Sequence, residues 1–117
     1  PTIYGDGTQT RDFTYVANNV QANILATTAK SVAGKIINIA CGKSYSVLDL
    51  LKVINEALGK NIDPILVPER KGDIKHSLAD IELARKLLGY EMNVDFTEGI
   101  KRTVAWYLKN QSSKNKI

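Results

Sequence analysis

The stretch Gly5-Asp6-Gly7-Thr8-Gln9-Thr10-Arg11-Asp12-Phe13-Thr14-Tyr15-Val16 decides how the rest of the chain is interpreted. It joins a glycine turn to a strand-like segment, and that segment carries an arginine where Val, Ile, Phe or Tyr is preferred. The planar guanidinium of Arg11, with its five donors, suits a phosphate better than a lysine would. Arg11 is therefore a candidate ligand residue. The alternative is that Arg11 and Asp12 only cap a hairpin and form an ion pair elsewhere.

Composition limits the classes of protein to consider. The chain has 117 residues, 44% of them hydrophobic and 24% charged, which is typical of one globular domain. It contains no apolar run of about 18 residues and no basic-then-apolar leader, so we expect a cytoplasmic protein without a membrane span. The net charge of +4 comes from scattered cations without interleaved aromatics, which argues against nucleic acid and leaves a small polyanion as a partner.

The single cysteine, Cys41, cannot form an internal disulfide and is expected to be a small buried hydrophobic residue. No His/Cys cluster is present, so no metal site is predicted. The letters Gly5-x-Gly7 do not predict a dinucleotide site, because Thr10 occupies the third glycine position and a strand-like segment, residues 12–16, follows instead of a helix.

Periodicity predicts a mixed α/β fold with short strands and about four helices. The first helix should run over residues 16–29 with Asn18-Asn19 as its cap, and a second helix should follow a Ser46/Asp49 capping box and stop at Gly59. Two further helices are expected to start near Asp80 and Phe96. Extended segments are predicted at residues 1–4, at 36–40 as a buried strand, and at 64–67 as an edge strand. Residues 1–110 should form one domain, and 111–117 a disordered polar tail.

A polar run, residues 68–77, is too charged for a core and too rich in turn residues for a spacer, so we interpret it as the second half of the site. The motifs, in order, are Gly5-Asp6-Gly7, Arg11-Asp12-Phe13, Asn38-Ile39-Ala40 before Gly42, the helix at Ser46-Val47, Arg70-x-Gly72-Asp73 and Ala79-Asp80. Together they resemble the C-terminal, substrate-binding part of the extended short-chain dehydrogenase/reductase family. The likeness is greatest to its NAD-dependent UDP-glucose and UDP-N-acetylglucosamine 4-epimerases.

The resemblance implies roles for four residues. Arg11 and Arg70 would contact the diphosphate of a UDP-sugar, and Asp73 would accept hydrogen bonds from the ribose hydroxyls, which agrees with the chemistry of these side chains. Ser77 would lie beside the C2 substituent of the hexose, where a small side chain admits an N-acetyl group. Its Ser-x-x-Asp spacing to Asp80 also fits a helix cap.

Catalysis in the family belongs to an N-terminal Rossmann half, which binds NAD and carries a Tyr-x-x-x-Lys pair whose tyrosine acts as the general base. Hydride would pass from C4 of the sugar to NAD and return to the other face. No tyrosine of this chain has a lysine four residues later. The chain opens at Pro1 inside an apparent strand, so we expect that the Rossmann half is missing. This chain alone should then be inactive, with no catalytic or cofactor-binding residue.

The sequence leaves three points open. One is whether the parent is a homodimer. Another is whether it is a nucleotide-sugar 4,6-dehydratase or decarboxylase instead of an epimerase. The third is whether the chain is a stand-alone nucleotide-binding or interaction module.

Overall fold

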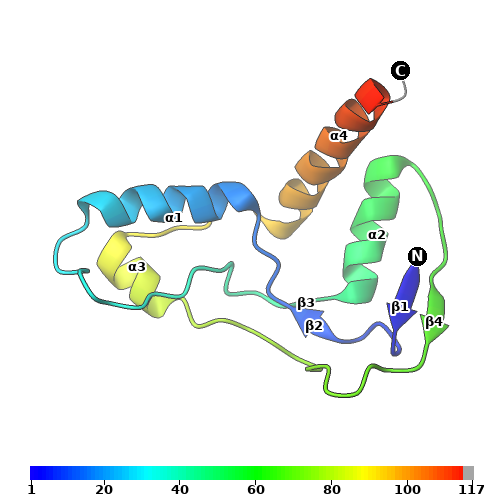
Figure 1. Ribbon diagram of the computed structural model, residues 1–117, viewed down its shortest axis with the longest axis horizontal. Coiled ribbons are helices and arrows are strands. Elements are labelled where there is room, and N and C mark those ends of the chain that lie inside the picture. Colours follow the sequence, from blue (N-terminus) through cyan, green and yellow to red (C-terminus); the bar gives the residue numbers. More distant parts are fainter. Residues whose placement is uncertain (115–117) are drawn as a thin grey trace.

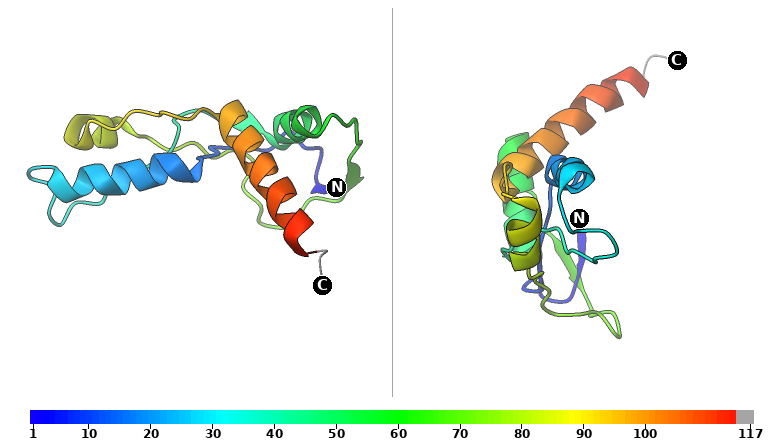
Figure 2. Two further views of the ribbon diagram at one scale, coloured as in Figure 1. Left: turned by 90° about the horizontal axis from the view of Figure 1, so that it is seen from above. Right: turned by 90° about the vertical axis from the view of Figure 1, so that its left-hand side faces the viewer.

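The computed structural model describes residues 1–114, with side chains as far as Asn110. The molecule is flat, with principal extents of 48 × 40 × 24 Å. The helices of residues 1–114 lie in two pairs (Figures 1 and 2). Helix α1 (Val16–Thr28) packs on α3 (Glu82–Leu88), and α2 (Val47–Leu58) packs on α4 (Phe96–Lys114). The predicted mixed α/β fold with about four helices is confirmed.

The strands are short and form two separate pairs. Strand β1 (Thr2–Tyr4) runs parallel to β4 (Ile65–Val67), and β2 (Thr10–Arg11) runs antiparallel to β3 (Tyr45–Ser46). The extended segments predicted at residues 1–4 and 64–67 are therefore confirmed. The strand-like continuation predicted for residues 12–16 is wrong, because β2 ends at Arg11 and α1 begins at Val16.

Helix α2 forms as its sequence predicts. The Ser46 hydroxyl accepts the Asp49 N–H while the Asp49 carboxylate accepts the Ser46 N–H, and Gly59 ends the helix in the left-handed conformation. The hydrogen bond from Ser46 lowers the pKa of Asp49. The glycine turn completes this N-terminus, since the carbonyls of Gly7 and Gln9 accept the N–H groups of Leu48 and Val47.

Helix α1 has the predicted length but not the predicted cap. Asn18 is fully buried inside the helix, where its amide donates to the Val94 carbonyl at 2.7 Å and accepts the Val94 N–H at 3.1 Å. The residue before the helix is Tyr15, which provides no side-chain cap. Asn18 thus joins α1 to the segment before α4 instead of capping the start of the helix.

A small cluster forms the core between α1 and α3. Ala22 and Ala84 let the helices approach closely, and the buried Tyr90 donates its hydroxyl proton to the Ala40 carbonyl at 2.9 Å. The predicted buried strand at residues 36–40 is wrong, because no ladder includes this segment in the described residues and Ile36 is 91% exposed. An apolar run stays out of a sheet when no neighbouring strand is present to accept its hydrogen bonds.

Apolar surface is exposed on α1. The stripe Val16, Val20 and Ile24 that predicts α1 is itself more than half exposed. Within residues 1–114, no helix is long and apolar enough to cross a membrane. Helix α4 is assigned as far as Lys114 and residues 115–117 lie outside the described residues, so the disordered tail at 111–117 stays a prediction.

We predict that Asn18→Ala lowers the free energy of unfolding by about 2–4 kcal/mol, because the buried N–H and C=O of Val94 both lose their partner. Chemical denaturation measures this loss. Asn19→Ala, at the exposed neighbouring position, is the control and should change stability by no more than about 0.5 kcal/mol. Equal effects of the two substitutions would contradict the assignment.

Candidate functional site

The site is organised by the short strand β2, which joins two distant parts of the chain. On one side Thr10 pairs with Ser46 of β3, and on the other it forms a parallel bridge to His76. The Thr10 N–H donates to the Lys75 carbonyl at 2.8 Å, and the Thr10 carbonyl accepts the Ser77 N–H at 3.2 Å. The Thr10 hydroxyl also lies 3.0 Å from His76 Nδ1. These contacts hold the polar loop, residues 68–77, against β2.

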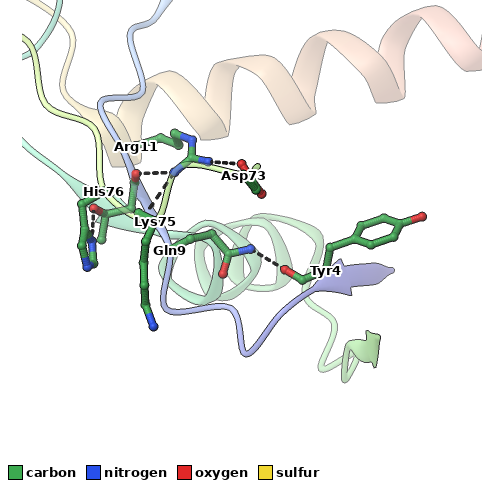
Figure 3. A network of polar contacts seen from close by, with 7 residues as sticks. Tyr4, Gln9, Arg11, Asp73, Lys75 and His76 are labelled. Atoms are coloured by element: carbon green, nitrogen blue, oxygen red, sulfur yellow. Dashed lines mark hydrogen bonds and ion pairs between the residues drawn. The ribbon is translucent and has the colours of Figure 1, made fainter. Parts of the chain in front are cut away.

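Arg11 projects from this strand towards the loop (Figure 3). Its Nη2 donates to Asp73 Oδ1 at 2.8 Å, and its Nη1 donates to the Thr10 carbonyl at 2.8 Å and to the Lys75 carbonyl at 3.5 Å. The structure thus joins two residues expected at the site that lie 62 positions apart in the chain. The two side chains are 31% and 44% exposed, so the ion pair contributes no more than about 1 kcal/mol to stability. Its main effect is to orient the guanidinium.

Arg70 is held differently. Its guanidinium carbon lies 3.8 Å from the centre of the Tyr4 ring, in a cation–π contact. Stacking uses the face of the guanidinium and leaves its in-plane N–H donors available to an anion. Tyr4 comes from the end of β1, where its carbonyl accepts the Gln9 side-chain amide at 2.8 Å. Arg11 is half-buried at the end of β2, and Arg70 is exposed in the polar loop.

A small hollow of about 40 Å³ lies between these elements. Tyr4 and Asp73 both line it, together with Asp6, Gln9, Glu69, Ile74 and Lys75. The hollow brings the end of β1 next to the polar loop, and its mixed charges give both donors and acceptors to a polar ligand.

Ser77 is exposed and its backbone is bound to β2, while its carbonyl lies 3.3 Å from the Ser44 hydroxyl, which donates to it. Asp80 Oδ1 accepts the Glu82 N–H at 2.8 Å just before α3, whose N-cap residue, Ile81, provides no side-chain cap. Within residues 1–110, the Ser77 side chain makes no hydrogen bond that would cap α3. Its role towards a hexose remains a prediction.

Asp12 has a role that sequence reasoning missed. Each of its carboxylate oxygens accepts one backbone N–H at 2.8 Å, from Cys41 and from Gly42. Tyr4 was missed as well, although an aromatic residue beside a glycine turn is a weak signal for stacking. For Asp12 no local signal exists, because its partners lie about 30 residues away.

Cys41 is 4% exposed, and its thiol lies 3.2 Å from the Phe13 carbonyl, to which it donates. Burial raises the pKa of the Cys41 thiol, which keeps it protonated and unreactive. The prediction of a small buried hydrophobic residue is confirmed. In the part of the chain that the structure describes, no group of three His, Cys, Asp or Glu side chains could hold a metal ion.

The glycine turn does not fit a nicotinamide cofactor. It leads into β2 and not into a helix N-terminus, which the pyrophosphate of a dinucleotide would need. Gly7 is buried against α2, where an added Cβ would lie 2.7 Å from Leu48 Cγ. Its lack of a side chain is explained by this close packing.

Solved structures of nucleotide-sugar enzymes share this fold. UDP-glucose 4-epimerase from Thermotoga maritima, solved with UDP-glucose, is 36% identical with a TM-score of 0.87, over 94% of this chain and 35% of that chain. UDP-N-acetylglucosamine 4-epimerase from Methanobrevibacter ruminantium, solved with UDP-N-acetylmuramic acid, is 40% identical with a TM-score of 0.85, over 94% of this chain and 35% of that chain. UDP-glucuronic acid 4-epimerase from Bacillus cereus, solved with UDP-glucuronic acid and NAD, is 32% identical with a TM-score of 0.85, over 92% of this chain and 35% of that chain.

The chain thus spans about a third of the length of the proteins it matches, with curated relatives covered over 35% and 33% of theirs. Its fold is that of the C-terminal part of an extended short-chain dehydrogenase/reductase, as the sequence predicts. More particularly, the chain belongs to the family whose model is described as GDP-mannose 4,6 dehydratase, which matches residues 1–103.

Proposed function

We propose that the chain is the UDP-sugar-binding part of an NAD-dependent UDP-hexose 4-epimerase. The observation that carries this proposal is that β2 and the polar loop bring Arg11 and Asp73 into direct contact. Similarity to epimerases solved with UDP-sugars supports it. Arg11 and Arg70 supply two guanidinium groups for the two phosphates, and charge-assisted hydrogen bonds of this kind are among the strongest in proteins.

Asp73 has a carboxylate oxygen beyond the one that binds Arg11, and a carboxylate accepts hydrogen bonds from a vicinal diol well. We assign it to the ribose. Ligand binding then places Asp73 between a sugar hydroxyl and Arg11, so that the ion pair aligns the nucleoside with the diphosphate. The residues of this chain bind and orient the nucleotide, while the hydride chemistry that NAD supplies belongs to the part of the protein outside this chain.

The exposed apolar surface supports a proposal for the position of that remaining part. The stripe of α1 is exposed, and so is Ile36, in a segment that belongs to no strand within residues 1–114. We propose that the Rossmann half covers α1 and pairs with residues 36–40. Homodimer formation and a cytoplasmic location stay predictions.

The reaction type can be decided by an assay of the full-length protein with NAD and UDP-galactose. An epimerase forms UDP-glucose without net consumption of NAD, whereas a 4,6-dehydratase, the activity that names the family model, forms a 4-keto-6-deoxy sugar from its own nucleotide sugar. Formation of a deoxy or decarboxylated product, with no epimer, would contradict the proposal.

The chain alone should bind no NAD and turn over no UDP-sugar, and turnover by a pure preparation would overturn this.

Arg11→Ala and Arg70→Ala should each weaken UDP-sugar binding to the full-length protein by about 1.5–3 kcal/mol, because each removes charge-assisted hydrogen bonds. Calorimetry at two salt concentrations measures the loss, and binding should weaken with salt. Arg85→Ala, which removes an exposed arginine of α3 paired with Glu82, is the matched control. Unchanged affinity in both arginine variants would show that these arginines are structural.

Asp73→Asn should lower affinity for UDP more than for inorganic diphosphate.

Ser77→Tyr tests the proposed size gate. A tyrosine beside C2 of the hexose should remove turnover of UDP-N-acetylhexosamines and spare UDP-glucose and UDP-galactose, because steric overlap discriminates sharply. Steady-state kinetics on both substrate classes measure the change, and Ser77→Ala should keep both activities. If the unmutated enzyme does not turn over UDP-N-acetylglucosamine, the size-gate argument fails.

A further inference from the structure

We infer that Asp12 is a positioning residue for the anion site, because its bidentate attachment to the loop at Cys41-Gly42 fixes the backbone from which Arg11 projects. This inference rests on the proposed function of Arg11. It concerns a residue that contacts no ligand atom in the proposal and acts through its neighbour.

Strand β2 cannot hold Arg11 by itself. It has two residues, and its pairing with β3 joins only Thr10 to Ser46 and Arg11 to Tyr45. Such a short ladder contributes little stability. The bridge to residues 75–77 comes from an exposed loop, so it cannot serve as a rigid reference either. A stronger attachment is needed next to Arg11.

Asp12 provides that attachment. Both of its oxygens are used, each by one N–H at 2.8 Å, and an ionised acceptor makes such bonds about twice as strong as neutral ones. Successive side chains of an extended chain point to opposite sides. When Asp12 is fixed on one side, Arg11 is directed to the other, where Asp73 accepts its donor.

The loop that Asp12 binds is itself fixed by the core. Ala40 and Cys41 are both 4% exposed, and the Ala40 carbonyl accepts the buried Tyr90 hydroxyl. Gly42 has φ of 69°, and an added Cβ would lie 2.9 Å from Ile81 Cδ1, so this backbone has little freedom to shift. A continuous path therefore runs from the core between α1 and α3, through the loop and Asp12, to Arg11.

The test uses Asp12→Asn in the full-length protein. The amide keeps the size of the side chain, but its NH₂ group faces a backbone N–H, so one of the two attachments is lost. We expect the Kd for UDP to rise about tenfold, roughly the loss of one charge-assisted hydrogen bond, and its salt dependence to fall towards that of Arg11→Ala. Combined with Arg11→Ala, the substitution should weaken UDP binding no further than Arg11→Ala does alone. Full additivity of the two losses would overturn the inference.

A second readout needs no ligand. The NMR signal of the Arg11 Nε–H group, assigned by its absence in Arg11→Ala, should shift in Asp12→Asn because the guanidinium loses its fixed orientation. Asn55→Ala is the matched control, since it also removes a two-point attachment from the folded chain but lies in α2, where the side chain binds the backbone of Ile62. It should lower the Tm and leave both the Arg11 signal and the Kd for UDP unchanged.

The outcomes separate the two proposals. An unmutated protein that does not bind UDP refutes the proposed function, while the Arg11 signal still decides the role of Asp12. A folded Asp12→Asn variant with an unchanged signal refutes the positioning role. If Asp12→Asn does not fold, Asp12→Glu keeps both acceptor oxygens on a side chain longer by one methylene, and it should shift the Arg11 signal and weaken UDP binding in the same direction. Unchanged values in that variant overturn the inference.

Discussion

The backbone of Thr10 is the point at which the molecule is assembled. It pairs with β3 on one edge, and on the other it exchanges hydrogen bonds with residues 75–77. The glycine turn before it supplies carbonyls to the first N–H groups of α2, so the same short segment also completes a helix. Strand β2 and the glycine turn before it thereby hold together β3, the start of α2 and residues 75–77, which are far apart in sequence. The position of the polar loop depends on these bonds, because its residues 68–77 are all exposed and form no core of their own.

Local signals predicted what local physics determines. The capping box, the apolar spacing and Gly59 lie within one stretch and predict α2 correctly, since each acts within a few residues. The strand prediction for residues 36–40 is wrong because a strand needs a partner, and the described residues offer none. The prediction that Asn18 caps α1 is wrong for a related reason. An asparagine near a helix start is typical of a cap, yet its partner, Val94, lies 76 residues away and overrides the local preference.

The candidate site was predictable in part. Arginines and an aspartate in glycine-containing polar segments are unusual enough to be noticed, and the structure brings Arg11 and Asp73 together. Which arginine pairs with which partner could not be predicted, because Arg11 and Arg70 are chemically identical. Only the fold places one against a carboxylate and the other against the Tyr4 ring. The attachment made by Asp12 depends on backbone N–H groups, which have no signature in the sequence.

The ion pair between Arg11 and Asp73 has a consequence for selectivity. A carboxylate already occupies one of the five donors of this guanidinium, so an anion would bind through donors that remain and would meet the negative charge of Asp73 beside them. The affinity of such an anion would be the difference between its attraction to Arg11 and its repulsion by Asp73. An anion with several oxygens could use more of the remaining donors than a monodentate anion. The internal ion pair would thus favour an anion with several oxygens over a monodentate one.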